Sequence, residues 1–215
     1  ILSKKPKNIF VIEKDTFLSK SLNNKFKNEI NVINEDVLNI DESKIFDKPM
    51  TVFGNLPYNI STQILVKWIR SKSLNQTFEK FILMFQKEVA DRIIANFNEK
   101  NYGRLSILTY WKMNVKKIKD VSPKSFYPAP KVESTILFME PKKKFFKFNN
   151  PKSLEYITNI FFNQKRKMIK KPMNLLFKNS ETIADKLKLD LTSRPQNLSP
   201  EKYFQICKEY ENLYQ

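Results

Sequence analysis

The residues best suited to chemistry lie in one short segment, FGNLPYNIST, from Phe53 to Thr62. An apolar run leads into this segment, so Asn55 and Leu56 come at the end of a predicted strand. The Asn55 side-chain oxygen and the Leu56 carbonyl could accept the two hydrogens of an exocyclic amine such as that of adenine. That bonding favours a pyramidal nitrogen whose lone pair faces a methyl donor. The pattern indicates catalysis by positioning and electrostatics, without a general base.

Pro57 and Tyr58 complete this hypothesis. Pro57 would fix the backbone, so that the Leu56 carbonyl keeps its direction. Tyr58 offers a face on which a flipped base can stack. The alternative is an ordinary strand-to-helix turn, where Asn and Pro are common for conformational reasons alone. These four residues by themselves leave both interpretations open.

The composition excludes several other kinds of site. The 215 residues contain no histidine and one cysteine, Cys207. Serine-histidine triads, cysteine-histidine dyads, common histidine-based metal sites and disulfides are therefore excluded. No stretch is apolar over the length of a membrane span, and the first residues lack the order of a signal peptide. We expect a cytoplasmic protein with no bound metal and no membrane partner.

The charge distribution indicates a polyanionic partner. The net charge is +17, and residues 141–178 hold eleven Lys or Arg against one acid, Glu155. The alternative is a generally basic surface, because only five of the cations are arginine. The phosphates of a nucleic acid are the groups that such cations would contact. We predict that one basic helix meets RNA phosphates through Lys165, Arg166, Lys167, Lys170 and Lys171.

The hydrophobic pattern alternates between strands and helices up to Pro141. Strands are predicted at 8–15, 30–38, 50–58, 132–141 and from residue 80, and helices at 16–26, 60–71 and 88–97. Residues 104–121 look strand-like but could be partly helical. This alternation predicts a mostly parallel sheet. The later segments 153–177, 180–189 and 199–214 look helical, so we expect a catalytic domain at 1–145 and a helical RNA-binding domain at 146–215.

Four motifs occur in a specific order: FGNLPYNIST, FQKEVADRI (85–93), YGRLSIL (102–108) and SFYPAPKVEST (125–135). Together they resemble the small-subunit ribosomal RNA adenine dimethyltransferase family. FFNQKRKMIKKPMNLLF and RPQNLSPEKYF resemble that family's helical domain, so the resemblance covers essentially the whole chain. It implies an α/β, Rossmann-like methyltransferase sheet followed by a small all-helical domain.

The resemblance also implies an activity and its partners. Members of the family use S-adenosylmethionine to convert two neighbouring adenosines of small-subunit rRNA to dimethyladenosine. They act on the assembling small ribosomal subunit. For this chain we therefore expect the same reaction, with Asn55, Leu56, Pro57 and Tyr58 as the catalytic residues, and we expect a monomer.

Further site residues follow from the resemblance alone. Glu13, at the end of the first predicted strand, resembles the acid that binds the cofactor ribose. Asp36 resembles the residue that contacts the cofactor adenine, with Val37 packed beside it, and Asn55 also borders the cofactor. The alternatives are a surface acid for Glu13 and a turn acid for Asp36.

The target base is expected to lie between aromatic side chains. Phe126 resembles an aromatic residue that borders the base, together with Tyr58. A lone phenylalanine is equally well explained as part of a core.

The chain departs from the family pattern in its glycines. Family members begin with a Gln-Asn-Phe-Leu segment, a strand and a Glu-x-Gly-x-Gly-x-Gly loop that cradles the cofactor methionine. This chain has only Gly54 and Gly103 and starts near the helix that follows the loop, so we expect an N-terminally incomplete sheet.

Three other functions stay open at this point. The first is a non-catalytic RNA-binding assembly factor, or a fragment unable to bind the cofactor. The second is a resistance-type methyltransferase of large-subunit rRNA, which would share the Asn-Leu-Pro-Tyr arrangement. The third is DNA adenine methylation, which is weaker because such enzymes usually carry Asp in place of Asn55.

Overall fold

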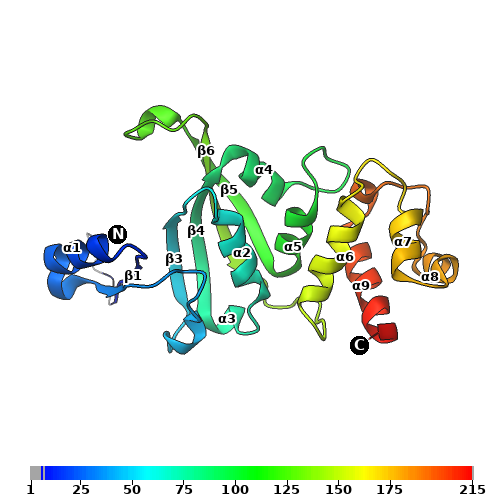
Figure 1. Ribbon diagram of the computed structural model, residues 1–215, viewed down its shortest axis with the longest axis horizontal. Helices are drawn as coiled ribbons and strands as arrows, with labels where there is room; N and C mark the ends of the chain where they lie inside the picture. Colours follow the sequence, from blue (N-terminus) through cyan, green and yellow to red (C-terminus); the bar gives the residue numbers. More distant parts are fainter. Residues whose placement is uncertain (1–5, 7, 215) are drawn as a thin grey trace. The chain divides into compact units, whose positions relative to one another are not determined.

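The computed structural model describes Pro6 and residues 8–214, shown as a ribbon in Figure 1. The chain forms two compact units, residues 1–47 and residues 48–215. In the described part of the chain, no helix combines the length and apolar character needed to cross a membrane.

The first unit is a strand-helix-strand arrangement. β1 (Phe10–Ile12) and β2 (Asn31–Ile33) pair in parallel, and α1 (Thr16–Phe26) connects them. The Asp15 carboxylate accepts the Leu18 amide at 2.8 Å and caps the start of α1. Such a cap satisfies one of the free N–H groups of the first helical turn. The two predicted strands and the helix between them are confirmed.

The second unit contains a four-stranded sheet in the order β3-β4-β6-β5. β3 (Met50–Asn55) and β4 (Phe78–Gln86) are parallel, whereas β6 (Ser134–Pro141) is antiparallel to both β4 and β5 (Met113–Val121). The prediction of a mostly parallel sheet is therefore wrong for this half. The connection from β5 to β6, residues 122–133, contains a short 3-10 turn at Pro123–Ser125 in place of the crossover helix that usually joins parallel strands.

The helices α2 (Ser61–Arg70), α3 (Leu74–Thr77), α4 (Lys87–Ile94) and α5 (Arg104–Lys112) belong to the same unit as this sheet (Figure 1). The strand-like segment 104–121 proves to be half helix and half strand. Seven of the nine residues of α5 are buried, so the helix shows no amphipathic period that its sequence could reveal.

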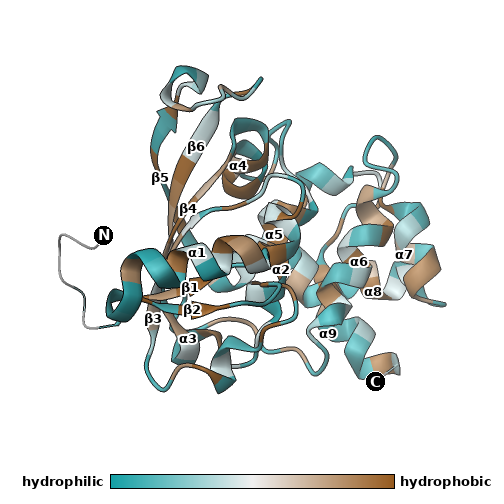
Figure 2. Ribbon diagram, turned by 60° about the vertical axis from the view of Figure 1, so that its left-hand side comes forward, coloured by the Kyte–Doolittle hydropathy of each residue, from teal (hydrophilic) through white to brown (hydrophobic). Residues whose placement is uncertain are grey.

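The core of the second unit rests on one face of the sheet. Phe81, Leu83 and Phe85 alternate along β4 and are fully buried. Trp68 of α2 packs against Phe81 with ring centroids 5.2 Å apart. Burying one such side chain stabilises the fold by about 1.5–3 kcal/mol. Figure 2 shows the contrast with β5, in which hydrophilic residues dominate.

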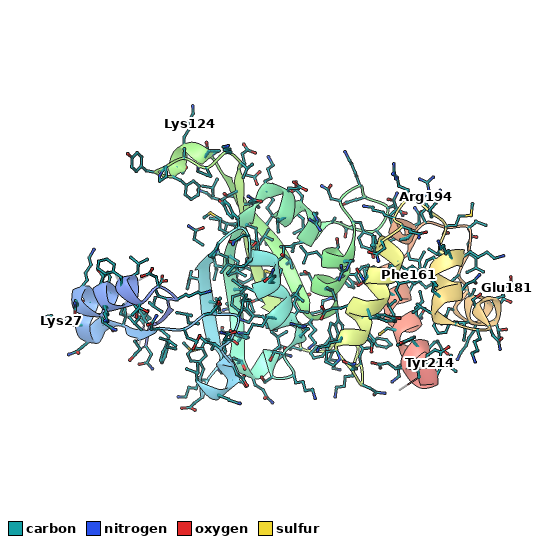
Figure 3. The ribbon with its side chains drawn as sticks, in the orientation of Figure 1. Lys27, Lys124, Phe161, Glu181, Arg194 and Tyr214 are labelled. Carbon is teal, nitrogen blue, oxygen red and sulfur yellow. The ribbon has the colours of Figure 1, made fainter. Side chains whose placement is uncertain are left out.

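The C-terminal part contains α6 (Lys152–Phe162), α7 (Lys170–Leu176), α8 (Ser180–Leu187) and α9 (Pro200–Tyr214). Phe161, labelled in Figure 3, is fully buried and meets Tyr203 of α9 edge to face. The predicted helix 153–177 is interrupted, because residues 163–169 form turns.

The predicted basic helix is therefore wrong for its first cations: Lys165, Arg166 and Lys167 lie in these turns. Tertiary hydrogen bonds override the helical pattern here. The Ile169 amide donates to the Ser193 carbonyl at 2.8 Å. A domain boundary after residue 145 falls in the connection between β6 and α6 and stays a prediction.

That connection is fastened at its middle and near its C-terminal end. The Trp111 indole donates to the Phe146 carbonyl at 2.6 Å. The two carboxylate oxygens of Glu211, a residue that is 1% exposed, each accept one backbone N–H at 2.9 Å, from Asn149 and Asn150. Glu211 thus ties α9 to the segment that precedes α6.

Lys112 lies in the interior at the end of α5, with an exposed fraction of 3%. Its ammonium donates to the Ser71 carbonyl at 2.9 Å and lies 4.4 Å from the centre of the Trp111 ring. Burial lowers the pKa of Lys112 to about 8, because removal from water disfavours the charged form.

Candidate active site and basic groove

Asn55 is the last residue of β3, at the edge where the parallel strands β3 and β4 both end. Ligands of open α/β sheets lie beyond this kind of edge. Gly54 has little room for a side chain, since an added Cβ would lie 2.9 Å from Leu56 Cδ2 and 3.0 Å from Leu83 Cδ2. Glycine therefore lets β3 pack closely just before the Asn-Leu-Pro-Tyr segment.

A hydrogen-bonded turn carries the chain from β3 into α2. The Ile60 amide donates to the Pro57 carbonyl at 3.1 Å, and the buried Ser61 hydroxyl donates to the Tyr58 carbonyl at 3.2 Å. These bonds fix the backbone on the C-terminal side of Asn55. The segment is thus a defined strand-to-helix turn. This form is compatible with a catalytic segment and with an ordinary turn, the two interpretations of the sequence.

The acceptors proposed for catalysis are accessible. The Asn55 side chain is exposed. Within the described residues, neither the Asn55 carboxamide nor the Leu56 carbonyl has a hydrogen-bond partner in the protein. Both oxygens can therefore accept hydrogens from a bound amine.

Tyr58 is held from its far end. Its hydroxyl lies 2.6 Å from the hydroxyl of Ser134, which is fully buried at the start of β6. The preceding residue, Glu133, accepts the Lys87 amide at 2.9 Å through its carbonyl and pairs with the Lys87 ammonium through its carboxylate. The start of β6 thus anchors both the Tyr58 ring and the first residue of α4.

Ser134 was not among the residues that the sequence singled out. It lies within the motif SFYPAPKVEST, but a serine there shows no sign of its partner far away in the sequence. Phe126 is half-buried in the connection that leads to Ser134, and its amide donates to the Pro123 carbonyl at 3.1 Å. The two aromatic residues predicted to border the base therefore lie on segments that the Tyr58–Ser134 bond joins.

The acids predicted to bind the cofactor lie together in the first unit. Glu13 follows β1 and is half-buried, and one of its oxygens accepts the Asp15 amide at 2.8 Å. Asp36 follows β2, accepts the Leu38 amide at 2.9 Å and pairs with Lys14 at 2.8 Å. This carboxylate raises the pKa of the Lys14 amine.

These residues fit the adenosine half of S-adenosylmethionine. Since β1 and β2 are parallel, both acids stand at the carboxyl edge of the pair. The second oxygen of Glu13 can accept ribose hydroxyls, and Asp36 already accepts an N–H donor from an amine. Half-buried Val37 supplies an apolar neighbour. The only two glycines of the chain, Gly54 and Gly103, follow neither strand.

The predicted cations border two adjoining depressions in the C-terminal part. One, of about 540 Å³, is lined by Lys165, Arg166, Lys167 and Lys171, among others. The second, of about 860 Å³, is lined by Arg166, Lys167, Lys170, Lys171 and Arg194, together with Met168 and Leu175. None of the described residues that line it is an Asp or a Glu. We call these two depressions the basic groove. The structure therefore brings all five predicted cations together.

The five cations differ in how free they are. The Lys165 ammonium donates to the Lys100 carbonyl at 2.6 Å and the Tyr102 carbonyl at 2.8 Å, and burial lowers its pKa. Lys170 lies 3.6 Å from Glu181. Arg194 was missed by the sequence reasoning, although it opens the motif RPQNLSPEKYF. It projects at the margin of the C-terminal part in Figure 3.

Comparison with known proteins shows which family the chain belongs to. The family model of ribosomal RNA adenine dimethylases matches residues 1–212. The ribosomal RNA small subunit methyltransferase A of Pelagibacter ubique is 57% identical over 213 residues, which cover 99% of this chain and 81% of the relative. The protein of the same name from Ehrlichia chaffeensis is 40% identical over 211 residues, covering 96% of this chain and 78% of the relative.

Two solved structures are also similar. A dimethyladenosine transferase from Plasmodium falciparum has a TM-score of 0.74 and 26% identity, covering 96% of this chain and 82% of that one. The 23S rRNA methyltransferase ErmE has a TM-score of 0.67 and 20% identity over 98% of this chain and 84% of that one, a likeness in fold. The chain belongs to the ribosomal RNA adenine dimethylase family, which consists of S-adenosylmethionine-dependent methyltransferases.

Proposed function

We propose that this protein methylates the exocyclic amines of two adjacent adenosines in small-subunit rRNA and gives dimethyladenosine. The observation that carries the proposal is the exposed Asn55 carboxamide at the carboxyl end of β3, beside a Tyr58 ring that Ser134 holds. The names of the relatives support small-subunit rRNA as substrate, whereas the name of ErmE gives 23S rRNA.

The residues of the segment divide the work. The Asn55 oxygen and the Leu56 carbonyl accept the two amine hydrogens, which concentrates the nitrogen lone pair on one side of the base. Pro57 limits rotation of the backbone next to that carbonyl. Tyr58 stacks against the base, and Phe126 borders it. S-adenosylmethionine, when bound, supplies the methyl group, and Glu13, Asp36 and Val37 would hold its adenosine half.

The basic groove holds the RNA backbone in this proposal. Exposed Arg166, Lys167 and Lys171 present positive charge in a depression whose described lining residues include no Asp or Glu. Contacts to phosphates position an RNA without reading its sequence. The selection of two particular adenosines then comes from the shape of the assembling small subunit. We further propose that the protein acts as a monomer in the cytoplasm, a reducing compartment that suits its single, buried Cys207.

Replacement of Asn55 tests the assigned chemistry. Asn55→Ala removes one acceptor of the amine hydrogens and should lower methyl transfer to unmodified small subunits by roughly 100-fold, in the range measured when one transition-state hydrogen bond is removed. RNA affinity should stay nearly unchanged, because Asn55 lies outside the basic groove. Equal loss of both properties would refute the catalytic role.

A further inference from the structure

The connection between β5 and β6 forms a projecting tip. We call residues 122–133 the β5–β6 tip. In Figure 1 it extends past the ends of β5 and β6, away from the helices that pack on the same sheet. Lys124, labelled in Figure 3, points from it into solvent.

Tyr127 of the tip exposes its entire side chain. Its exposed fraction is 101%, above that of every other large apolar residue in the described part of the chain, where Phe17 follows at 79%. An aromatic ring usually gains stability by burial, and buried aromatic rings contribute strongly to binding surfaces. A ring that no part of its own unit covers is therefore a candidate for contact with another molecule.

The backbone of the tip is held in place, which lowers the entropic cost of ordering this ring on binding. The Ser122 hydroxyl accepts the Lys124 amide at 3.3 Å, and the Ser125 amide donates to the Ser122 carbonyl at 3.0 Å. Three prolines restrict the chain further: Pro123, Pro128 and Pro130. The backbone that carries the ring therefore loses little freedom when a partner stacks on it.

The charge of the tip selects the class of partner. Lys124 and Lys131 lie on either side of Tyr127, and both are exposed. No Asp or Glu occurs from Ser122 to Val132. An aromatic face between cations is the combination that binds single-stranded nucleic acid, because every base can stack and every linkage is anionic. Charge complementarity therefore favours RNA over an uncharged protein surface.

The tip is also connected to the reaction centre. It ends at Glu133, which binds Lys87, and is followed by Ser134, which binds Tyr58. We propose that Tyr127, flanked by Lys124 and Lys131, is a stacking platform for an unpaired RNA nucleotide that neighbours the target adenosine. This inference rests on the proposed function and adds a contact with a nucleotide that is not itself methylated.

A fluorescent reporter at the same position tests the contact. Tyr127→Trp places an indole at the exposed site, whereas the native Trp68 and Trp111 are 4% and 3% exposed. Acrylamide should therefore quench the new indole selectively. When a short single-stranded RNA with two adjacent adenosines saturates the protein, quenching should fall several-fold. Tyr156→Trp, at a tyrosine of α6 that is 49% exposed, should show no such protection.

The same RNA, carrying a dye for anisotropy, separates the possible outcomes. If anisotropy shows binding but the indole at position 127 stays as accessible as before, the stacking platform is refuted while the proposed function stands. If the RNA does not bind at all, this inference is refuted, whereas the proposed function is tested separately by methyl transfer to unmodified small subunits.

Affinity gives a second, independent measurement. Loss of one stacked base costs about 1–3 kcal/mol, so Tyr127→Ala should weaken binding of this RNA roughly five-fold or more. Tyr127→Phe keeps the aromatic face and should bind like wild type. Equal affinities of the Ala and Phe variants would overturn the proposal.

Discussion

The hydrogen bond between Tyr58 and Ser134 allows the account of the site to be tested at a residue that does not touch the substrate. Ser134→Ala removes the partner of the Tyr58 hydroxyl, 2.6 Å away, and leaves only a small void at this fully buried position because a single oxygen atom is lost. Tyr58 is half-buried, so water can partly replace the lost partner. We expect a cost of about 1 kcal/mol in holding the ring, equivalent to a roughly five-fold change.

The assay is kcat/KM for methyl transfer to unmodified small subunits. Ser134→Ala and Tyr58→Phe should each lower it about five-fold, because each removes one end of the same bond. The double variant should be no slower than either single variant, which gives a coupling energy of about 1 kcal/mol. Strictly additive losses, or a Ser134→Ala enzyme as fast as wild type, would refute the reasoning.

Three other predictions concern stability and RNA binding. Lys112→Met should remove a pH dependence of the stability. Burial lowers the pKa of Lys112 from 10.5 to about 8, so the folded protein loses this proton at a lower pH than the unfolded chain does. In urea titrations, the free energy of unfolding of the wild type relative to that of the variant should therefore rise by about 2 kcal/mol between pH 7 and pH 10. Glu211→Ala should lower the free energy of unfolding by about 2 kcal/mol or more, because two backbone N–H groups lose their acceptor. Glu211→Gln should lower it by less, and equal stability of all three proteins would contradict the buried contact. Alanine at both Arg166 and Lys167 should remove two phosphate contacts and so reduce the slope of log affinity for single-stranded RNA against log salt by about 1.4. Lys165→Met should mainly lower the melting temperature, because the Lys165 ammonium binds two backbone carbonyls, and the opposite pattern would exchange these roles.

The sequence predicted those parts of the fold whose pattern is local. Short apolar runs located β1, β3 and β4, alternation of apolar and polar residues located β2, and the change of pattern after Pro141 located the C-terminal helices. The antiparallel pairing of β5 and β6 was missed, because period-two alternation carries no information about strand direction. The helix within 104–121 was only an alternative, since its burial on nearly all sides removes the periodic signal.

For the site, the sequence predicted which residue types gather but not how they are held. Asn55 and Tyr58 were identified from their chemistry, whereas the bond from Tyr58 to Ser134 joins residues far apart in the chain. The basic cluster was identified from charge alone. Charge does not distinguish Lys165, whose ammonium binds two carbonyls, from Arg166, whose side chain is exposed.

The most direct test of the central claim is the identity of the product. Unmodified small subunits would be incubated with this chain and methyl-labelled S-adenosylmethionine, and the rRNA digested to nucleosides for mass spectrometry. The account predicts label in dimethyladenosine at two adjacent positions of small-subunit rRNA, with none when Asn55→Ala replaces wild type. Label in large-subunit rRNA, in another nucleoside, or equally in the Asn55→Ala reaction would contradict it.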